Sequence, residues 1–157
     1  MSLTQHLIDT NNAQSAQFFA AVDKVPADKL EWRPLDNGRS ALDIAAEVAM
    51  STTWPLAFMP GAPKFEMTEE IMTEFMAEKA KLTSIADIKA KAAEGLAKTN
   101  EALAGLSEAD LNEPIETFFS PVPLPRVAAL SAFADNARYH TGQINYIQTL
   151  YGDMSFP

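Results

Sequence analysis

One histidine in the second half of the chain, His140, stands among side chains that could complete a chemical site. It lies in the stretch DNARYHTGQINYIQTLYG, residues 135–152. An imidazole can ligate a metal ion or transfer a proton, but both tasks need further polar groups directed at the same ring. Asn136 lies four residues earlier, one helical turn away on the same side. Glu47 is the second candidate, in the mostly apolar stretch ALDIAAEVAM. The other histidine, His6, falls on the polar face of a predicted helix, and we expect it to face solvent.

Glu47, Asn136 and His140 allow two kinds of chemistry. Glu47 and His140 could hold a divalent ion while Asn136 orients a bound water or substrate. Without a metal, Glu47 and His140 could instead act as a proton-transferring pair. Gln143 lies on the flank of the same helical face and could hydrogen-bond a facing helix. The candidate pocket therefore consists of Glu47, Asn136, His140 and Gln143.

The same residues also have a purely structural interpretation. A buried imidazole must find partners for its ring nitrogens, and the spacing alone favours a core histidine satisfied by one neighbour. Gly142 costs about 1 kcal/mol inside a helix, so we expect another backbone to pack close beside it. Glu47 falls on a polar stripe that periodicity predicts to face water. That stripe consists of Ser40, Asp43, Glu47 and Ser51.

Helical periodicity predicts the elements that position these groups. Apolar residues recur at three- and four-residue steps over four main segments, and Ser-x-x-Asp sequences mark the starts of two of them. A shorter segment with one apolar side, residues 68–76, separates the second main helix from the third. The main helices are expected at residues 3–25, 40–54, 85–106 and 126–151. The sequence therefore predicts an all-α four-helix bundle with an extra short helix between main helices 2 and 3, in which residues 1–157 form a single domain.

Composition narrows the range of partners and locations. The chain carries 12 basic and 21 acidic residues, and its net charge of −9 repels nucleic-acid phosphates and anionic lipid. It contains no cysteine, so disulfides and zinc–thiolate sites are excluded. We find neither a secretion signal nor an uncharged run able to span a bilayer. A cytoplasmic protein that binds neither nucleic acid nor membrane is the expectation.

The motif YHTGQI, residues 139–144 in the final helix, resembles the signature of the DinB-like superfamily, which includes bacillithiol- and mycothiol-dependent transferases. The resemblance extends to LEWRP after the first helix and to SALDIAAEVA at the start of the second, and it covers nearly the whole chain. Such proteins typically bind a divalent metal, often zinc or nickel, through three histidines. One histidine comes from the second helix, and two lie four residues apart in the last.

Carried onto this sequence, the resemblance places the three metal-ligand positions at Glu47, Asn136 and His140. Imidazole suits zinc and nickel, carboxylate is an acceptable ligand, and a neutral amide is a weak one. A Glu47–His140 ion pair could equally fill the metal's place. We therefore expect a degenerate three-histidine site that holds no metal tightly and binds a small molecule. The alternative is a metal-dependent thiol transferase or hydrolase that acts on a small substrate.

The resemblance also implies a homodimer, because such proteins commonly pair through helix faces. The apolar side of the short segment 68–76 could supply that contact, or it could close the core instead. This apolar side consists of Ile71, Met72, Phe75 and Met76.

Overall fold

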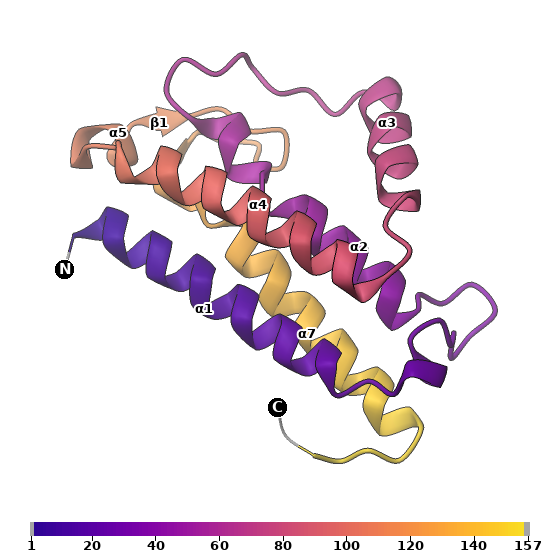
Figure 1. Ribbon diagram of the computed structural model, residues 1–157. Coiled ribbons are helices and arrows are strands. Elements are labelled where there is room, and N and C mark those ends of the chain that lie inside the picture. The colour runs from indigo at the N-terminus through magenta and orange to yellow at the C-terminus, as the bar shows by residue number, and fades with distance from the viewer. Residues whose placement is uncertain (1, 156–157) are drawn as a thin grey trace.

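Four main helices form the body of the protein in the computed structural model, which describes residues 2–155. They are α1 (Leu3–Asp23), α2 (Ala41–Ser51), α4 (Ile85–Ala104) and α7 (Ala132–Leu150). Helix α1 packs against α4 and α7, and α2 packs against the same two helices from the other side (Figure 1). The predicted all-α four-helix bundle is therefore confirmed. None of the described helices is both long and apolar enough to cross a membrane.

Serine and threonine side chains fix the starts of most helices. Ser40 and Ser84 each accept a hydrogen bond from the backbone N–H three residues later, at Asp43 and Asp87. This contact satisfies one of the amides that a first helical turn leaves without a partner. The two Ser-x-x-Asp starts predicted from the sequence are confirmed.

The other elements lie between and beside these four helices. The predicted extra helix is α3 (Glu69–Ala80), which stands away from the bundle at the end of a long connecting segment (Figure 1). The predicted last helix is wrong in one respect, because it is divided at Ser131 into α6 (Arg126–Leu130) and α7. The remaining elements are η1 (Ala27–Lys29), η2 (Trp54–Phe58), α5 (Glu108–Asn112), and the antiparallel pair β1 (Pro114–Ile115) and β2 (Leu124–Pro125).

The main core lies where α1, α2, α4 and α7 meet. Its largest side chains with no exposed surface are Phe18, Ile88, Phe133 and Ile144. A second apolar cluster, at the α5–α6 end, includes Leu103, Leu111 and Leu130. Most of the stability of these helices comes from burial of such amphipathic faces.

Helix α3 takes little part in this core. Lys79 is the only buried residue among those described in α3, whereas Ile71, Met72 and Met76 are exposed. The idea that its apolar side closes the core is therefore wrong. Its use as a homodimer contact stays a prediction.

The expected close packing at Gly142 is also wrong, because a Cβ there would meet nothing within 4 Å. The close approach occurs at Gly95 of α4 instead, where a Cβ would lie 2.1 Å from Oγ1 of Thr52. That hydroxyl donates to the carbonyl of Ala49, and Thr99 of α4 donates to the carbonyl of Thr52. Helices α2 and α4 therefore require a residue without a side chain at position 95.

Substitution of the two helical glycines tests this difference. We expect Gly95→Ala to lower the free energy of unfolding by about 1–3 kcal/mol, because the added methyl overpacks a filled interface. Gly142→Ala is the matched control and should raise it by about 0.5–1 kcal/mol, the ordinary gain in a helix interior. Urea denaturation of both variants measures the two changes. Equal stability of the two variants would contradict the packing described.

Candidate functional site

His140 of α7 is held on both sides by hydrogen-bond partners. Its Nε2 atom lies 3.0 Å from Oε1 of Glu47 on α2, and its Nδ1 atom lies 2.6 Å from Oε1 of Gln143. The amide nitrogen of Gln143 in turn donates to the hydroxyl of Tyr139 at 3.0 Å. The His140 side chain is only 2% exposed. The structure thus brings Glu47, His140 and Gln143 together around a buried ring.

Glu47 is shared between His140 and a guanidinium. Nη2 of Arg39, the residue just before the N-cap of α2, lies 2.5 Å from Oε2 of Glu47. Nε of the same Arg39 donates to Oδ2 of Asp43 at 2.8 Å. Both Glu47 oxygens are therefore engaged within the protein.

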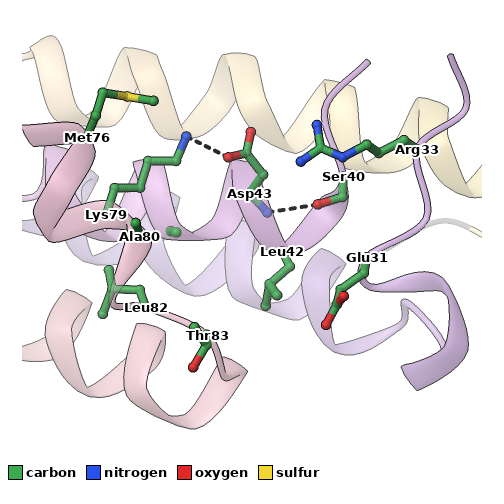
Figure 2. Close-up of a pocket in the computed structure, with 11 residues that line it drawn as sticks. Glu31, Arg33, Ser40, Leu42, Asp43, Met76, Lys79, Ala80, Leu82 and Thr83 are labelled. Carbon is green, nitrogen blue, oxygen red and sulfur yellow. Dashed lines mark hydrogen bonds and ion pairs between the residues drawn. The ribbon is translucent and has the colours of Figure 1, made fainter. Parts of the chain in front are cut away.

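The network extends from Asp43 to α3. Nζ of Lys79 lies 2.7 Å from Oδ1 of Asp43, a contact drawn in Figure 2 between α3 and the first turn of α2. The aliphatic stem of Lys79 is buried while its ammonium pairs with the carboxylate. Since Lys79 is the only buried residue described in α3, this ion pair is the main attachment of α3 to the bundle. We call the connected residues the ion-pair network; they are Arg39, Asp43, Glu47, Lys79 and His140.

The network keeps both carboxylates charged. The hydrogen bond from His140 lowers the pKa of Glu47 below its ordinary value of 4.5, with the nearby charge of Arg39 adding to the effect and burial opposing it. Burial works to raise the pKa of Asp43, but hydrogen bonds from Lys79 and Arg39 outweigh it and lower that pKa. Opposite charges and hydrogen bonds to the ionised form stabilise the carboxylates in this way. At neutral pH both are carboxylate anions paired with cations.

Asn136 takes a different partner from the other predicted site residues. Its amide nitrogen donates to Oγ of Ser51 at 3.0 Å, and that hydroxyl donates to the carbonyl of Val48. Asn136 is thus tied to α2 one turn beyond the Glu47–His140 contact. The Glu47–His140 and Ser51–Asn136 contacts run in opposite order along the two helices, so α2 and α7 are antiparallel.

The donor set at positions 47, 136 and 140 does not fit a divalent metal. Glu47 already accepts from His140 and from the cationic Arg39, and a metal ion placed there would face the guanidinium charge. Asn136 offers only a weak amide ligand for zinc or nickel and is bonded to Ser51. Among residues 2–155, no group of three or more His, Cys, Asp and Glu side chains is arranged to hold a metal ion.

The predicted solvent-facing stripe on α2 is wrong. Ser40 and Ser51 are buried and Glu47 is half-buried, because the stripe faces α7 and α3. His6, by contrast, is exposed on α1 as expected. Sequence reasoning missed Arg39, although it precedes Asp43 and Glu47 by four and eight residues and so falls on the same helical stripe.

A shallow groove of 620 Å³ opens beside the network, between the start of α2 and the end of α7. Arg39 and Gln143 lie in its wall together with Tyr139, so polar members of the site reach its surface. We call it the tyrosine groove. Its other principal wall residues are Leu35, Tyr146 and Leu150.

Two solved structures share this arrangement of helices. A conserved protein from Enterococcus faecalis matches with a TM-score of 0.68 at 18% sequence identity, covering 98% of this chain and 99% of its own. A DinB-like protein from Bacillus subtilis matches with a TM-score of 0.62 at 17% identity, covering 100% of this chain and 96% of its own. The chain has the DinB-like fold. No family model and no curated protein matches the sequence.

The DinB-like fold agrees with the resemblance seen in the YHTGQI motif. Sequence identities of 17–18% establish a shared fold but not a shared function. The chemistry of this chain is therefore argued from its own geometry at Glu47 and His140.

Replacement of Glu47 by glutamine tests the network through pH. At pH 7 we expect Glu47→Gln to lower the free energy of unfolding by about 1.5–3 kcal/mol, the range for hydrogen bonds to a charged group. Because the folded-state pKa of Glu47 is lowered, its stabilisation is complete above the ordinary value of 4.5 and is lost as pH falls through the lower folded value. The gap between the two proteins should therefore narrow below about pH 4.5 in urea denaturation series.

Glu94→Gln is the control for this experiment. Glu94 is an exposed carboxylate paired with Lys98, and such surface pairs contribute little. Its replacement should leave stability nearly unchanged at pH 7. A Glu47→Gln effect as small as that of Glu94→Gln would contradict the role given to the network.

Proposed function

We propose that this protein of DinB-like fold binds a small molecule without a metal, in the tyrosine groove. The observation that carries the proposal is the path of hydrogen bonds from the buried ring of His140 to the groove wall. His140 is hydrogen-bonded to Gln143, and Gln143 is hydrogen-bonded to Tyr139. Gln143 and Tyr139 both line the groove. Glu47 positions Arg39 there from the other side.

The groups on the groove wall are mainly hydrogen-bond donors. The Gln143 amide uses its oxygen on His140 and one N–H on Tyr139, which leaves a second N–H. Within residues 2–155, Nη1 of Arg39 has no hydrogen-bond partner, while Nε and Nη2 bind carboxylates. Donors of this kind select a ligand that carries an acceptor oxygen, such as a carbonyl.

The rest of the groove is apolar and exposed. The side chains of Leu35 and Tyr146 are 73% and 65% exposed, and Leu150 lies beside them. Large apolar side chains that converge on a few fixed polar groups are typical of small-molecule sites. The proposed ligand therefore combines an aromatic or aliphatic body with one acceptor group.

The geometry favours this binding role over the two kinds of catalysis considered from the sequence. A general acid or base must reach the proton that it transfers, whereas both ring nitrogens of His140 are occupied and the ring is buried. A metal-dependent transferase or hydrolase needs free ligands, and Glu47 and Asn136 are committed to Arg39, His140 and Ser51. Glu47 and His140 are accordingly positioning residues for the groove.

The exposed apolar side of α3 supports, as a separate proposal, the expected homodimer. Met72 and Met76 are exposed side by side on this helix, one turn apart. Apolar surface of this kind is a candidate contact between two copies.

Acetophenone tests the proposed function, because it joins a phenyl ring to a carbonyl acceptor and carries no N–H or O–H donor. We expect it to shift the side-chain amide signal of Gln143 and the backbone signal of Tyr146 in proton–nitrogen correlation spectra. Tyr146→Ser should weaken this binding about tenfold, since it removes an apolar wall and leaves the donors in place.

Phe119→Ser, a change outside the groove, is the control and should leave the affinity for acetophenone unchanged. Two results would contradict the proposal. One is a set of shifted signals that excludes Gln143 and Tyr146, and the other is an affinity unaffected by Tyr146→Ser.

A further inference from the structure

A second hollow lies at the opposite end of the contact between α2 and α7. Its volume is 490 Å³, and Thr53, two residues past the end of α2, and Ala132, at the start of α7, both line it. The Glu47–His140 and Ser51–Asn136 contacts lie between it and the tyrosine groove along these antiparallel helices. We call it the phenylalanine hollow. Its principal walls are Trp54, Phe58, Phe65, Met67, Phe118 and Phe119.

Four phenylalanine walls of the hollow contact one another in three pairs, two edge to face and one tilted. Ring centroids are 5.8 Å apart for Phe58 and Phe119 and 5.2 Å apart for Phe118 and Phe119. Phe65 lies 5.4 Å from Phe118 by the same measure. These distances fall within the favourable range for aromatic pairs, so the rings form a connected wall.

The buried Arg126 fixes the backbone of Phe58, one of the walls of the hollow. The Arg126 guanidinium donates to the carbonyl of Phe58 and, through Nε at 3.0 Å, to the carbonyl of Asp110. It also pairs with Glu113. Arg126 therefore connects η2 to α5 and α6. Since η2 carries Trp54 and Phe58, these contacts hold two walls of the hollow in place.

The chemistry of the lining defines the ligand class. Among the described residues 2–155, no charged side chain lines the hollow, and the chain carries a net charge of −9, so a charged ligand would lose its hydration without gaining a partner. Within residues 2–155 the polar side-chain groups of the lining are the indole N–H of Trp54 and the hydroxyl of Thr53, which donates to the carbonyl of Met50 at 3.3 Å and so presents an acceptor. A ligand with one N–H or O–H donor can use that acceptor.

We propose that the phenylalanine hollow binds a small, uncharged aromatic molecule that carries one hydrogen-bond donor. The hollow is concave and within the volume range of small-molecule sites, which favours such a ligand over a flat protein surface. Phe118 remains 53% exposed, although an aromatic side chain of that size usually buries more of its surface. A ligand between Phe118, Phe119 and Trp54 would cover this apolar area.

N-phenyl-1-naphthylamine, a neutral fluorescent amine with one N–H donor, is the test probe. The chain contains two tryptophans, and Trp32 packs on Tyr151 away from the hollow. Trp32→Phe therefore leaves Trp54 as the only tryptophan, within the proposed site. We expect saturable probe binding with energy transfer from Trp54. The anionic probe 8-anilinonaphthalene-1-sulfonate should bind more weakly, because the lining offers no cation.

Two variants test where the probe binds, one by removing walls of the hollow and the other by filling it. Phe118→Ser/Phe119→Ser removes two walls and should weaken binding at least about tenfold. Ala132→Phe fills the hollow and should abolish binding without removing any wall. Circular dichroism and thermal unfolding verify that each variant is folded. Tyr146→Ser, in the tyrosine groove, is the matched control and should leave the affinity for the probe unchanged.

Four outcomes would overturn the proposal. They are unsaturable probe binding, affinity insensitive to both hollow variants, loss of binding in Tyr146→Ser, and tighter binding of the anionic probe. Sedimentation of the wild-type protein and of Phe118→Ser/Phe119→Ser tests another occupant: a dimer that dissociates in the variant would assign the hollow to a second copy instead. Failure here leaves the acetophenone result at Gln143 and Tyr146 unaffected, because acetophenone lacks the donor that the hollow requires, so the two sites are tested independently.

Discussion

The hydrogen bond between Glu47 and His140 is the interaction on which the site depends. A buried imidazole is costly unless its nitrogens have partners, and Glu47 supplies one from the facing helix. The charge of Glu47 is in turn neutralised by Arg39, and Asp43 joins Arg39 to Lys79. One buried ring thus couples the loop before α2, the helices α2 and α7, and the peripheral helix α3.

The Glu47–His140 hydrogen bond also divides the contact between α2 and α7 into two regions of different chemistry. At one end, Arg39 and Gln143 present donors to a groove with exposed apolar walls. At the other end, beyond Ser51 and Asn136, the lining is aromatic and uncharged. Two separate hollows therefore lie along this contact, and the Glu47–His140 and Ser51–Asn136 hydrogen bonds lie between them.

The fold could be predicted from local signals, whereas the site could be predicted only in part. Apolar periodicity and serine caps are encoded within single helices, so the bundle and the starts at Ser40 and Ser84 are confirmed. The break at Ser131 and the open space beside Gly142 depend on packing between elements that are distant in sequence. The helical stripe gave no sign that Ser51 would take Asn136 as its partner, because a stripe shows only which residues share a face. Arg39 was overlooked because it lies before the helix, although its spacing places it on the stripe.

The central claim is that the site formed by Glu47, Asn136 and His140 holds no metal, and zinc content tests it most directly. Elemental analysis after zinc loading and dialysis compares the wild-type protein with Glu47→His/Asn136→His. The double variant supplies two further imidazoles beside His140, and zinc sites commonly use three protein ligands. We predict that the wild-type chain retains little zinc, whereas the double variant retains about one ion per chain and loses it when His140→Ala is added. Stoichiometric zinc in the wild-type protein that His140→Ala removes would contradict the account.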